Sequence, residues 1–405
     1  MSERPTVRFL DRSTPPHMFT LIVMTGLSAL AMNLFLPSLP RMTEYFQTDY
    51  RIMQLSVAVY LGVNGVLQLV VGPLSDRYGR RPVILWGFGL FCLATLGCIF
   101  SPTIEVFLLF RMCQATIVVA MVLSRAVVRD MVGQAEAASM IGYVTMGMAI
   151  APMIGPAIGG ILDQTFGWQA SFWVLLAGGL SIMALIWFDQ GETAQTQSTS
   201  FRDQVREYPE LLLSRRFWGY CLTAALCSGA FFAYLGGAPF VGSVVFALEP
   251  SALGFFFGAP AVGYMLGNFV SGQYSIRLGI NRMILWGVLL NCGGLTASLL
   301  IFLAGYGTVY SFFGFMVFVG FGNGMVLPNA NAGMLSVRPH LAGTASGLGG
   351  SMMIGGGAAL SALAGAMLTP ETGAEMLIWI MTASAVLAVV AITYTISRER
   401  KVLAD

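Results

Sequence analysis

Charge is scarce in this sequence. Asp, Glu, Lys and Arg together make up 10% of its 405 residues, whereas 56% are hydrophobic and the mean hydropathy is +0.76. A chain of this size cannot bury so many apolar side chains in a water-soluble core, so the composition excludes a soluble globular protein. It predicts an all-α membrane protein that is surrounded by a lipid bilayer.

Side chains suited to catalysis or metal binding are also few. The two histidines, His17 and His340, lie outside the predicted membrane spans, and the six cysteines fall within spans at irregular spacing. We interpret the cysteines as packing residues and predict no disulfide framework, no metal site and no cofactor. An enzyme or a membrane-embedded sensor is disfavoured, because enzyme chemistry needs a nucleophile with its base or a set of metal ligands.

Carboxylates are missing from the predicted membrane interior. Of the 19 acidic residues, those that do not lie at the predicted cytoplasmic ends of spans lie at the outer ends. The outer group is Glu44, Asp49, Glu105, Asp163, Glu249, Glu371 and Glu375. Proton-coupled transport usually needs an ionisable group in the interior, where burial makes its charge state worth exchanging, and no such group remains at the midplane.

Long apolar runs are what the sequence has in abundance. Each run has about 20 residues and is long enough to cross roughly 30 Å of hydrocarbon as a helix. We predict twelve spans, at 18–40, 52–75, 83–101, 106–128, 137–162, 168–189, 217–245, 251–276, 283–305, 308–335, 342–368 and 374–397. Their many Gly and several Pro suit close helix packing and broken helices in lipid.

The placement of cations predicts the orientation of the chain. With the N-terminus inside, only Arg41 and Arg51 among the arginines of the loops and tails fall on the outer side. Together with the even number of spans, this asymmetry places both termini in the cytoplasm. The polar residues 1–17 are followed by no small-residue cleavage site, so the first span is expected to stay as a helix.

A long hydrophilic stretch divides the chain into two halves. We predict an N-terminal tail, a six-helix half, a linker, a second six-helix half and a C-terminal tail, at 1–17, 18–189, 190–216, 217–397 and 398–405. Within the linker, Ser200 and Asp203 resemble a capping box, and apolar residues from Phe201 to Leu212 fall at helical spacing, so a short interfacial helix is expected.

An internal repeat supports this division. Residues 72–92 match residues 272–292 at 10 of 21 positions without a gap, and Trp86 pairs with Trp286 in this alignment. Two duplicated halves of six spans are the arrangement of many secondary transporters, with the substrate site between the halves near the midplane.

The loop between spans two and three carries the clearest motif. Its sequence, GPLSDRYGRR, resembles the G-x-x-x-D-R-x-G-R-R signature of the major facilitator superfamily. Gly79 permits the sharp turn, and Asp76 can pair with an Arg or approach a helix N-terminus, a contact that would hold the cytoplasmic side closed. The alternative is that these arginines only set topology. The residues assigned to this gating loop and its neighbourhood are Gly72, Asp76, Arg77, Gly79, Arg80, Arg81, Arg129 and Asp130.

Other runs extend the resemblance over nearly the whole chain. In span four, FRMCQA resembles the family's R-x-x-Q-G motif, with Ala115 in place of the usual Gly. The runs LPSLPRM, SRAVVRDM and YLGGAPF resemble the bicyclomycin/chloramphenicol-resistance (Bcr/CflA) branch of drug:proton antiporters. The resemblance implies proton-driven export of drugs or metabolites across the bacterial inner membrane, by a protein expected to act as a monomer and to bind no nucleic acid.

Span five resembles the motif of exporters that work as antiporters. Small residues there allow tight packing against a neighbouring helix, and prolines bend the span. Glycine-rich packing without a specific function is the alternative. The matching residues are Gly147, Pro152, Gly155, Pro156, Gly159 and Gly160.

Asn33 marks a departure from the family. Members of the branch typically read A-M-D where this chain reads Ala31-Met32-Asn33, so an amide stands where a proton-exchanging carboxylate is expected. Pro37 cannot donate to the carbonyl of Asn33, so span one should bend there. Asn33 either helps to satisfy that kink or faces the cavity near Arg111. Protons could instead be exchanged at Asp76, Asp130 or Glu105, or on the substrate itself.

Two arginines of span four lie in the predicted membrane interior. Arg111 and Arg125 are 14 residues apart, about 21 Å along a helix. A buried Arg stays charged and needs a partner. We interpret Arg125 as structural, snorkelling to the interface or joining Asp130. For Arg111, a hydrogen-bond hub to span-one carbonyls and a direct role in substrate binding or coupling remain equal alternatives.

Polar residues at helical spacing complete the candidate substrate site. Tyr60, Asn64 and Gln68 form one stripe on span two, although packing between helices would also explain such residues. The candidates for substrate binding or coupling are Asn33, Tyr60, Asn64, Gln68, Arg111, Gln114, Tyr234, Tyr264 and Asn268. Because the cavity would hold Arg111 but no carboxylate, neutral or anionic substrates are favoured. The alternative is a facilitator or importer of a small metabolite without classical proton coupling.

Overall fold

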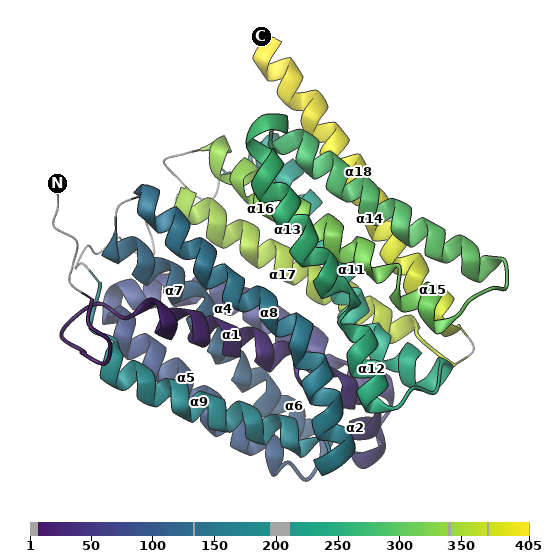
Figure 1. Cartoon of the computed structure of the whole chain (residues 1–405), viewed down its shortest axis with the longest axis horizontal. Coiled ribbons are helices and arrows are strands. Elements are labelled where there is room, and N and C mark those ends of the chain that lie inside the picture. Colours follow the sequence, from purple (N-terminus) through teal and green to yellow (C-terminus); the bar gives the residue numbers. More distant parts are fainter. Residues whose placement is uncertain (1–6, 133, 195–210, 339–341, 371, 405) are drawn as a thin grey trace.

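A computed structural model describes residues 7–132, 134–194, 211–338, 342–370 and 372–404. Its elements are helices joined by short connections (Figure 1). In the first half they are α1 Met18–Asn33, η1 Leu36–Ser38, α2 Leu39–Tyr45, α3 Tyr50–Met53, α4 Leu55–Tyr78, α5 Arg80–Ile99, α6 Ile104–Cys113, η2 Gln114–Ile117, α7 Val118–Met131, α8 Gln134–Phe166 and α9 Gln169–Asp189. In the second half they are α11 Arg215–Phe240, η3 Val241–Val245, α12 Pro250–Phe257, α13 Ala259–Leu278, α14 Ile280–Leu303, α15 Val309–Phe313, α16 Met316–Val337, α17 Ala342–Met367 and α18 Gly373–Ala404.

The twelve predicted spans correspond to this order of helices. Over the described residues, 11 stretches are long and apolar enough to cross a membrane. The helix α8, with 33 residues, covers the predicted fifth span and completes the set. The expected interfacial helix of the linker falls largely on residues 195–210, which lie outside the described residues.

Helices from the two halves form two groups (Figure 1). The purple to teal group is α1 to α9, and the green to yellow group is α11 to α18. The groups meet where α4 packs against α17 and where α8 packs against α12. We call the end of the bundle at the α4–α5 turn the Gly79 end, and the end at the α8–α9 turn the Trp168 end.

Span one is interrupted where the sequence predicted it. The helix α1 ends at Asn33, Pro37 lies within the 3₁₀ turn η1, and α2 begins at Leu39. Because Pro37 lacks an N–H, the α-helical ladder cannot continue through it. The predicted break at this proline is therefore confirmed.

The interior is polar in places and the outer surface is apolar, the reverse of a soluble protein. Arg111, Gln114 and Thr95 are fully buried, whereas Trp86 is 74% exposed and its repeat partner Trp286 is 58% exposed. Exposed large apolar side chains face lipid at no cost, while buried polar groups must find partners inside the bundle. The distribution confirms a multi-pass membrane protein.

Candidate functional site

Arg111 is held near the centre of the first half by a chain of hydrogen bonds. It lies in the last turn of α6, just before the 3₁₀ turn η2. Its Nε donates to the carbonyl oxygen of Ser56 over 3.2 Å, and its Nη1 donates to Oε1 of Gln114 over 2.8 Å. Gln114 in turn donates to the hydroxyl of Thr95 over 2.8 Å. The R-x-x-Q spacing thus lets the glutamine accept from the arginine one turn earlier.

Two aromatic rings cover the guanidinium of Arg111. Its Cζ lies 3.9 Å from the ring centre of Tyr60 and 4.3 Å from that of Phe35. Such desolvated contacts contribute on the order of 2 kcal/mol each. We call Phe35, Ser56, Tyr60, Thr95, Arg111 and Gln114 the Arg111 cluster. Its carbonyl acceptor belongs to span two, so the alternative of a hub to span-one carbonyls is wrong; span one contributes a ring.

The Arg111 cluster contains no carboxylate. Within the described part of the chain, Arg111 forms no ion pair, and its Nη2 is buried without a hydrogen-bond partner. A buried donor without a partner costs roughly 1–3 kcal/mol. Among the described residues, this nitrogen is therefore a buried donor that is left without an acceptor.

The three residues of the predicted stripe on span two make different contacts. Tyr60 belongs to the Arg111 cluster, whereas Gln68 donates to Oδ1 of Asn64 over 3.0 Å. Beside them, the hydroxyl of Ser351 on α17 donates to the carbonyl of Gly65 over 2.9 Å. Gln68, whose Oε1 would lie 3.1 Å from a Cβ at Gly350, is therefore beside α17 of the second half, whereas Tyr60 packs inside the first half.

Asn33 is buried where α1 faces α8. Its Nδ2 donates to the carbonyl oxygen of Ala29 over 2.7 Å, and Gly155 of α8 packs beside it. Its Oδ1 has no hydrogen-bond partner among the described residues. The side-chain amide of Asn33 thus bonds to a carbonyl one turn earlier in its own helix. Among the described residues, it forms no hydrogen bond with Arg111 or with the backbone at Pro37.

The second-half candidates do not gather with these residues. Tyr234 is fully buried, and its ring lies 4.8 Å from that of Phe257 in an aromatic layer of the second half, a packing position. Tyr264 and Asn268 are partly exposed on α13, where Nδ2 of Asn268 donates to the carbonyl of Tyr264 over 2.8 Å.

The span-five motif packs against both halves. A Cβ at Gly159 would lie 1.7 Å from the carbonyl oxygen of Leu34 on span one, and one at Gly160 would lie 2.2 Å from that of Pro250. Gly254 approaches the carbonyl of Pro156 in the same way. Tight packing through small residues is confirmed. Gly147 and Pro152 lie in the part of α8 whose side chains are not described.

The loop between α4 and α5 is held by an ionic cluster. Arg80 lies 2.5 Å from Oδ1 of Asp76 and 3.0 Å from Oδ2 of Asp130. Asp130 therefore pairs with Arg80, and the expected pairing with Arg125 is wrong. Among the described residues, the recorded partners of Asp76, Arg80 and Arg81 all lie in the first half or the start of the linker.

Other members of the predicted loop stand apart from this cluster. Arg77 lies over the ring of Tyr78, Arg129 donates to the carbonyl of Arg125, and Gly72 has open space around its Cβ position. Arg77 and Arg129 are exposed, so the alternative that they only set topology stays open.

Glu192 is a residue of this loop that sequence reasoning missed. Its carboxylate accepts from the backbone N–H of Arg80 over 2.8 Å and from that of Arg81 over 3.2 Å. Glu192 thus caps the N-terminus of α5, which is one of the two roles that the sequence indicates for Asp76. The sequence shows an acidic residue in the linker, but it does not indicate which helix N-terminus that residue reaches.

Gln54 is a second missed residue, at the Trp168 end. It is buried in span two, and its Nε2 donates to the backbone carbonyl of Ser361 and, over 3.0 Å, to its hydroxyl. Gly236 and Gly365 leave the space that its side chain occupies. Nearby, the hydroxyl of Tyr50 donates to the carbonyl of Gly236 over 2.8 Å. We call these five residues the Gln54 contact; it joins the halves at the Trp168 end.

Two helical bundles joined by a linker, with a polar cluster inside lipid-facing walls, define a membrane transporter. The family model "Major Facilitator Superfamily" matches residues 21–358. The chain belongs to the major facilitator superfamily, and it is a transporter rather than an enzyme.

Relatives agree with the branch that the sequence predicted. A chloramphenicol resistance protein from Pseudomonas aeruginosa is 30% identical over 78% of this chain and 76% of its own length. A bicyclomycin resistance protein homolog from Haemophilus influenzae is 26% identical over 96% of this chain and 98% of its own. A crystal structure of the peptide transporter POT in complex with sulfate superposes with a TM-score of 0.75, covering 95% of this chain and 94% of that one at 12% identity, a likeness of fold alone.

Proposed function

We propose that this transporter exports small amphipathic drugs or metabolites from the bacterial cytoplasm, with neutral and anionic compounds favoured over cations. The observation that carries the preference is Arg111, a fully buried cation with an unpartnered Nη2 and no carboxylate beside it in the described part of the chain. A cationic drug would meet an uncompensated like charge there, whereas a carbonyl, nitro or carboxylate oxygen would satisfy the nitrogen. The names of the relatives support export of antibiotics.

Transport proceeds in this proposal by alternating access of the two halves. The Gln54 contact holds the Trp168 end closed, and the motif loop at the Gly79 end would join the halves in the opposite state. Both termini lie in the cytoplasm in this scheme, so the Gly79 end is the inner side. The protein works as a monomer with substrate and protons as its partners.

Proton coupling is the second part of the proposal, and Asp163 is the carboxylate that suits it. Asp76 and Asp130 are occupied by Arg80, and Glu105 is exposed. Asp163 is fully buried, and in the described part of the chain its carboxylate oxygens accept no hydrogen bond. Its ionic partner is Arg41, 3.6 Å from Oδ2. An ionisable group inside a membrane protein is a candidate for exchange of protons.

A facilitator or importer of a small metabolite is the second candidate function. The observation that favours it is Asn33, because an amide without a titrating group occupies the place of the family carboxylate. Such a facilitator would move no protons with a neutral solute.

Efflux from reconstituted vesicles separates these functions. Purified protein would be placed in liposomes with a pH-sensitive dye inside, and chloramphenicol-like and ethidium-like compounds would be compared. The proposal expects transport of the neutral compound with a substrate-dependent pH change, and loss of both with Arg111→Ala. Equal transport of the cation would contradict the substrate preference, and transport without a pH change would favour the facilitator.

A further inference from the structure

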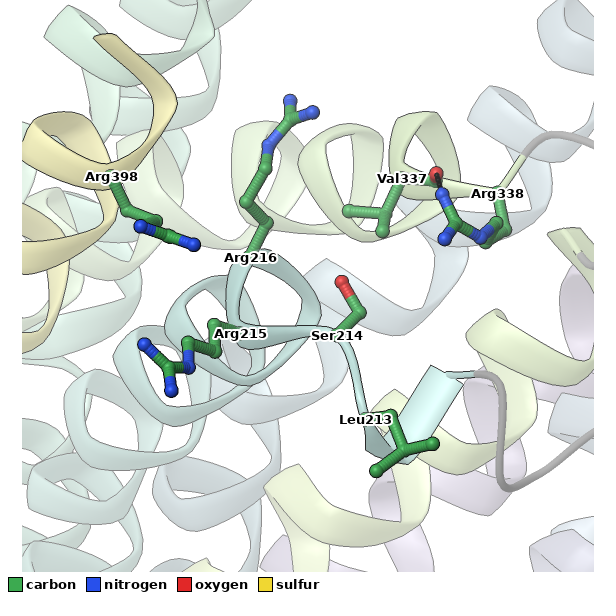
Figure 2. Close-up of a pocket in the computed structure, with 7 residues that line it drawn as sticks. All are labelled: Leu213, Ser214, Arg215, Arg216, Val337, Arg338 and Arg398. Atoms are coloured by element: carbon green, nitrogen blue, oxygen red, sulfur yellow. Dashed lines mark hydrogen bonds between the residues drawn. The ribbon is translucent and has the colours of Figure 1, made fainter. Parts of the chain in front are cut away.

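A cavity outside the Arg111 cluster opens at the Gly79 end of the second half (Figure 2). It has a volume of about 440 Å³ and lies between the start of α11, the end of α16 and the last turns of α18. It is lined by Leu213, Ser214, Arg215, Arg216, Val337, Arg338 and Arg398. We call it the four-arginine pocket. None of the residues predicted for substrate transport lines it.

The charged side chains that line this pocket are all arginines. Glu399 pairs with Arg216, and the same carboxylate accepts from Asn281. Within the described residues, neither Arg215 nor Arg398 forms an ion pair. In Figure 2, Arg398 reaches from α18 toward the first turn of α11, from which Arg215 and Arg216 project. Among the described residues, Arg215 and Arg398 thus line the same pocket without a paired carboxylate, and Glu399 is already engaged by Arg216 and Asn281.

The N-terminus of α11 adds to this field. Ser214 caps the helix, with its hydroxyl oxygen accepting from the N–H of Phe217 over 3.4 Å. The other N–H groups of the first turn and the positive end of the helix dipole face the same region. Planar guanidinium groups that surround a helix N-terminus match the oxygens of a phosphate group.

The residues beside the pocket are typical of a membrane–water interface. The side chain of Leu213 is 82% exposed at its rim, and the indole of Trp218 donates to the carbonyl of Leu212 over 2.7 Å. Apolar residues and Trp at a helix end are typical of the membrane–water interface. Basic pockets between helices at this depth are suited to phospholipid headgroups.

We propose that the four-arginine pocket binds a phosphate-bearing anion, supplied by the headgroup of an anionic phospholipid or by a soluble phosphate compound. The anion neutralises Arg215 and Arg398 and ties the beginning of α11 to the end of α18. This site is separate from the transport pathway, and it stands whether or not the proposed substrates are correct.

Lipid binding to the purified full-length protein tests the proposal. Binding of phosphatidylglycerol and phosphatidylcholine would be measured by native mass spectrometry for wild type, for Arg215→Gln/Arg398→Gln and for Arg277→Gln/Arg282→Gln. The last pair removes the same charge from exposed arginines at the same end of the same half. We expect phosphatidylglycerol to bind about thirtyfold more weakly to the pocket variant and nearly unchanged to the control, because each interfacial arginine contributes roughly fivefold.

Competition then identifies the source of the phosphate. If millimolar inorganic phosphate or glycerol 3-phosphate displaces the lipid and itself binds wild type, the site takes soluble phosphates. If neither competes, it is a lipid headgroup site. The proposal would be overturned if the pocket variant bound phosphatidylglycerol and inorganic phosphate as tightly as wild type does. It would also be overturned if the pocket variant and the Arg277→Gln/Arg282→Gln control lost the same amount of affinity. Elution of each variant as a folded monodisperse species is checked first, and Arg398→Gln alone replaces a pair that does not fold.

Discussion

The guanidinium carbon of Arg111 lies 3.9 Å from the centre of the Tyr60 ring, so an aromatic face takes the place of a counter-ion. The centre of the Phe35 ring lies 4.3 Å from the same carbon. A cation kept in this way is stabilised without a carboxylate that would attract cationic compounds. The cluster therefore links the packing of spans one, two and four to the selectivity proposed for the transporter.

Replacing the two members of this pair tests what each supplies. Tyr60→Leu should destabilise the purified protein by about 2 kcal/mol, because the guanidinium loses a ring face in a desolvated site. Tyr60→Phe keeps the face and should stay close to wild type. Arg111→Lys keeps the charge but loses the fork that reaches both Ser56 and Gln114, so efflux should fall at least tenfold.

Thermal unfolding in detergent and resistance of a drug-hypersensitive bacterium are the two measurements. The aromatic interpretation fails if Tyr60→Phe and Tyr60→Leu lose equal stability. It also fails if Arg111→Lys supports wild-type resistance.

A carboxylate at position 33 should alter the ions that the protein handles. Asn33→Asp places a titratable group at the buried junction of α1 and α8 without a change in size. We expect it to admit ethidium-like cations or to add substrate-dependent proton movement. The control Asn33→Ala removes the unpartnered Oδ1 and should do neither. Unchanged substrates and unchanged proton movement in Asn33→Asp would assign Asn33 to the scaffold.

Local patterns predicted those features that depend on neighbours in the chain. The spans, the break at Pro37 and the turn at Gly79 follow from apolar length, from a missing N–H and from the loop motif. The contacts of Arg111 with Ser56 and Tyr60, and those of Glu192 and Gln54, did not follow, because each joins residues that only the fold brings together. Gln54 meets Ser361, which is 307 positions away, and no spacing rule connects them.

The two repeated turns offer a matched pair for stability. Gly79 has φ 94° and Gly279 has φ 81°, so alanine at either position is strained by on the order of 1–3 kcal/mol. A Cβ at Gly79 would also lie 2.4 Å from the Glu192 carboxylate, whereas nothing lies within 4 Å at Gly279. Gly79→Ala should therefore lower the melting temperature more than Gly279→Ala.

The variant Glu192→Ala separates strain from contact. In that background the two alanine substitutions should have more similar costs, because the nearest neighbour of a Cβ at Gly79 is gone and only Pro82 Cδ, at 3.3 Å, still distinguishes the two positions. If the losses in melting temperature still differ as much as in the wild-type background, the contact with Glu192 is not the reason for the difference between Gly79→Ala and Gly279→Ala.

Closure at the Trp168 end should depend on Gln54. Gln54→Ala removes both hydrogen bonds to Ser361 and should shift the population toward states open at this end. Ser361→Ala keeps the backbone acceptor and should have a smaller effect. A thiol introduced by Ser38→Cys, at a fully buried position, reports opening through its rate of labelling by an impermeant maleimide. Labelling that is equally slow in all three backgrounds would contradict a gating role.

Asp163→Asn should uncouple transport from proton movement. The substitution keeps the shape of a fully buried side chain and removes its capacity to exchange a proton. The charged group recorded against it is Arg41, whose Nη1 also donates to the backbone carbonyl of Asp163 over 2.6 Å. If Asp163 carries protons, Asp163→Asn should still bind chloramphenicol-like compounds and exchange them across the vesicle membrane, while the substrate-dependent pH change disappears. Arg41→Gln breaks the same ion pair but leaves the carboxylate, so it should keep proton movement, with a changed pH dependence.

A purely structural pair predicts the opposite pattern, in which both variants lose stability together and the protons moved per substrate remain those of wild type. The ratio of protons to substrate, measured in the same vesicles for all three proteins, therefore decides whether this outer carboxylate replaces the one that span one lacks.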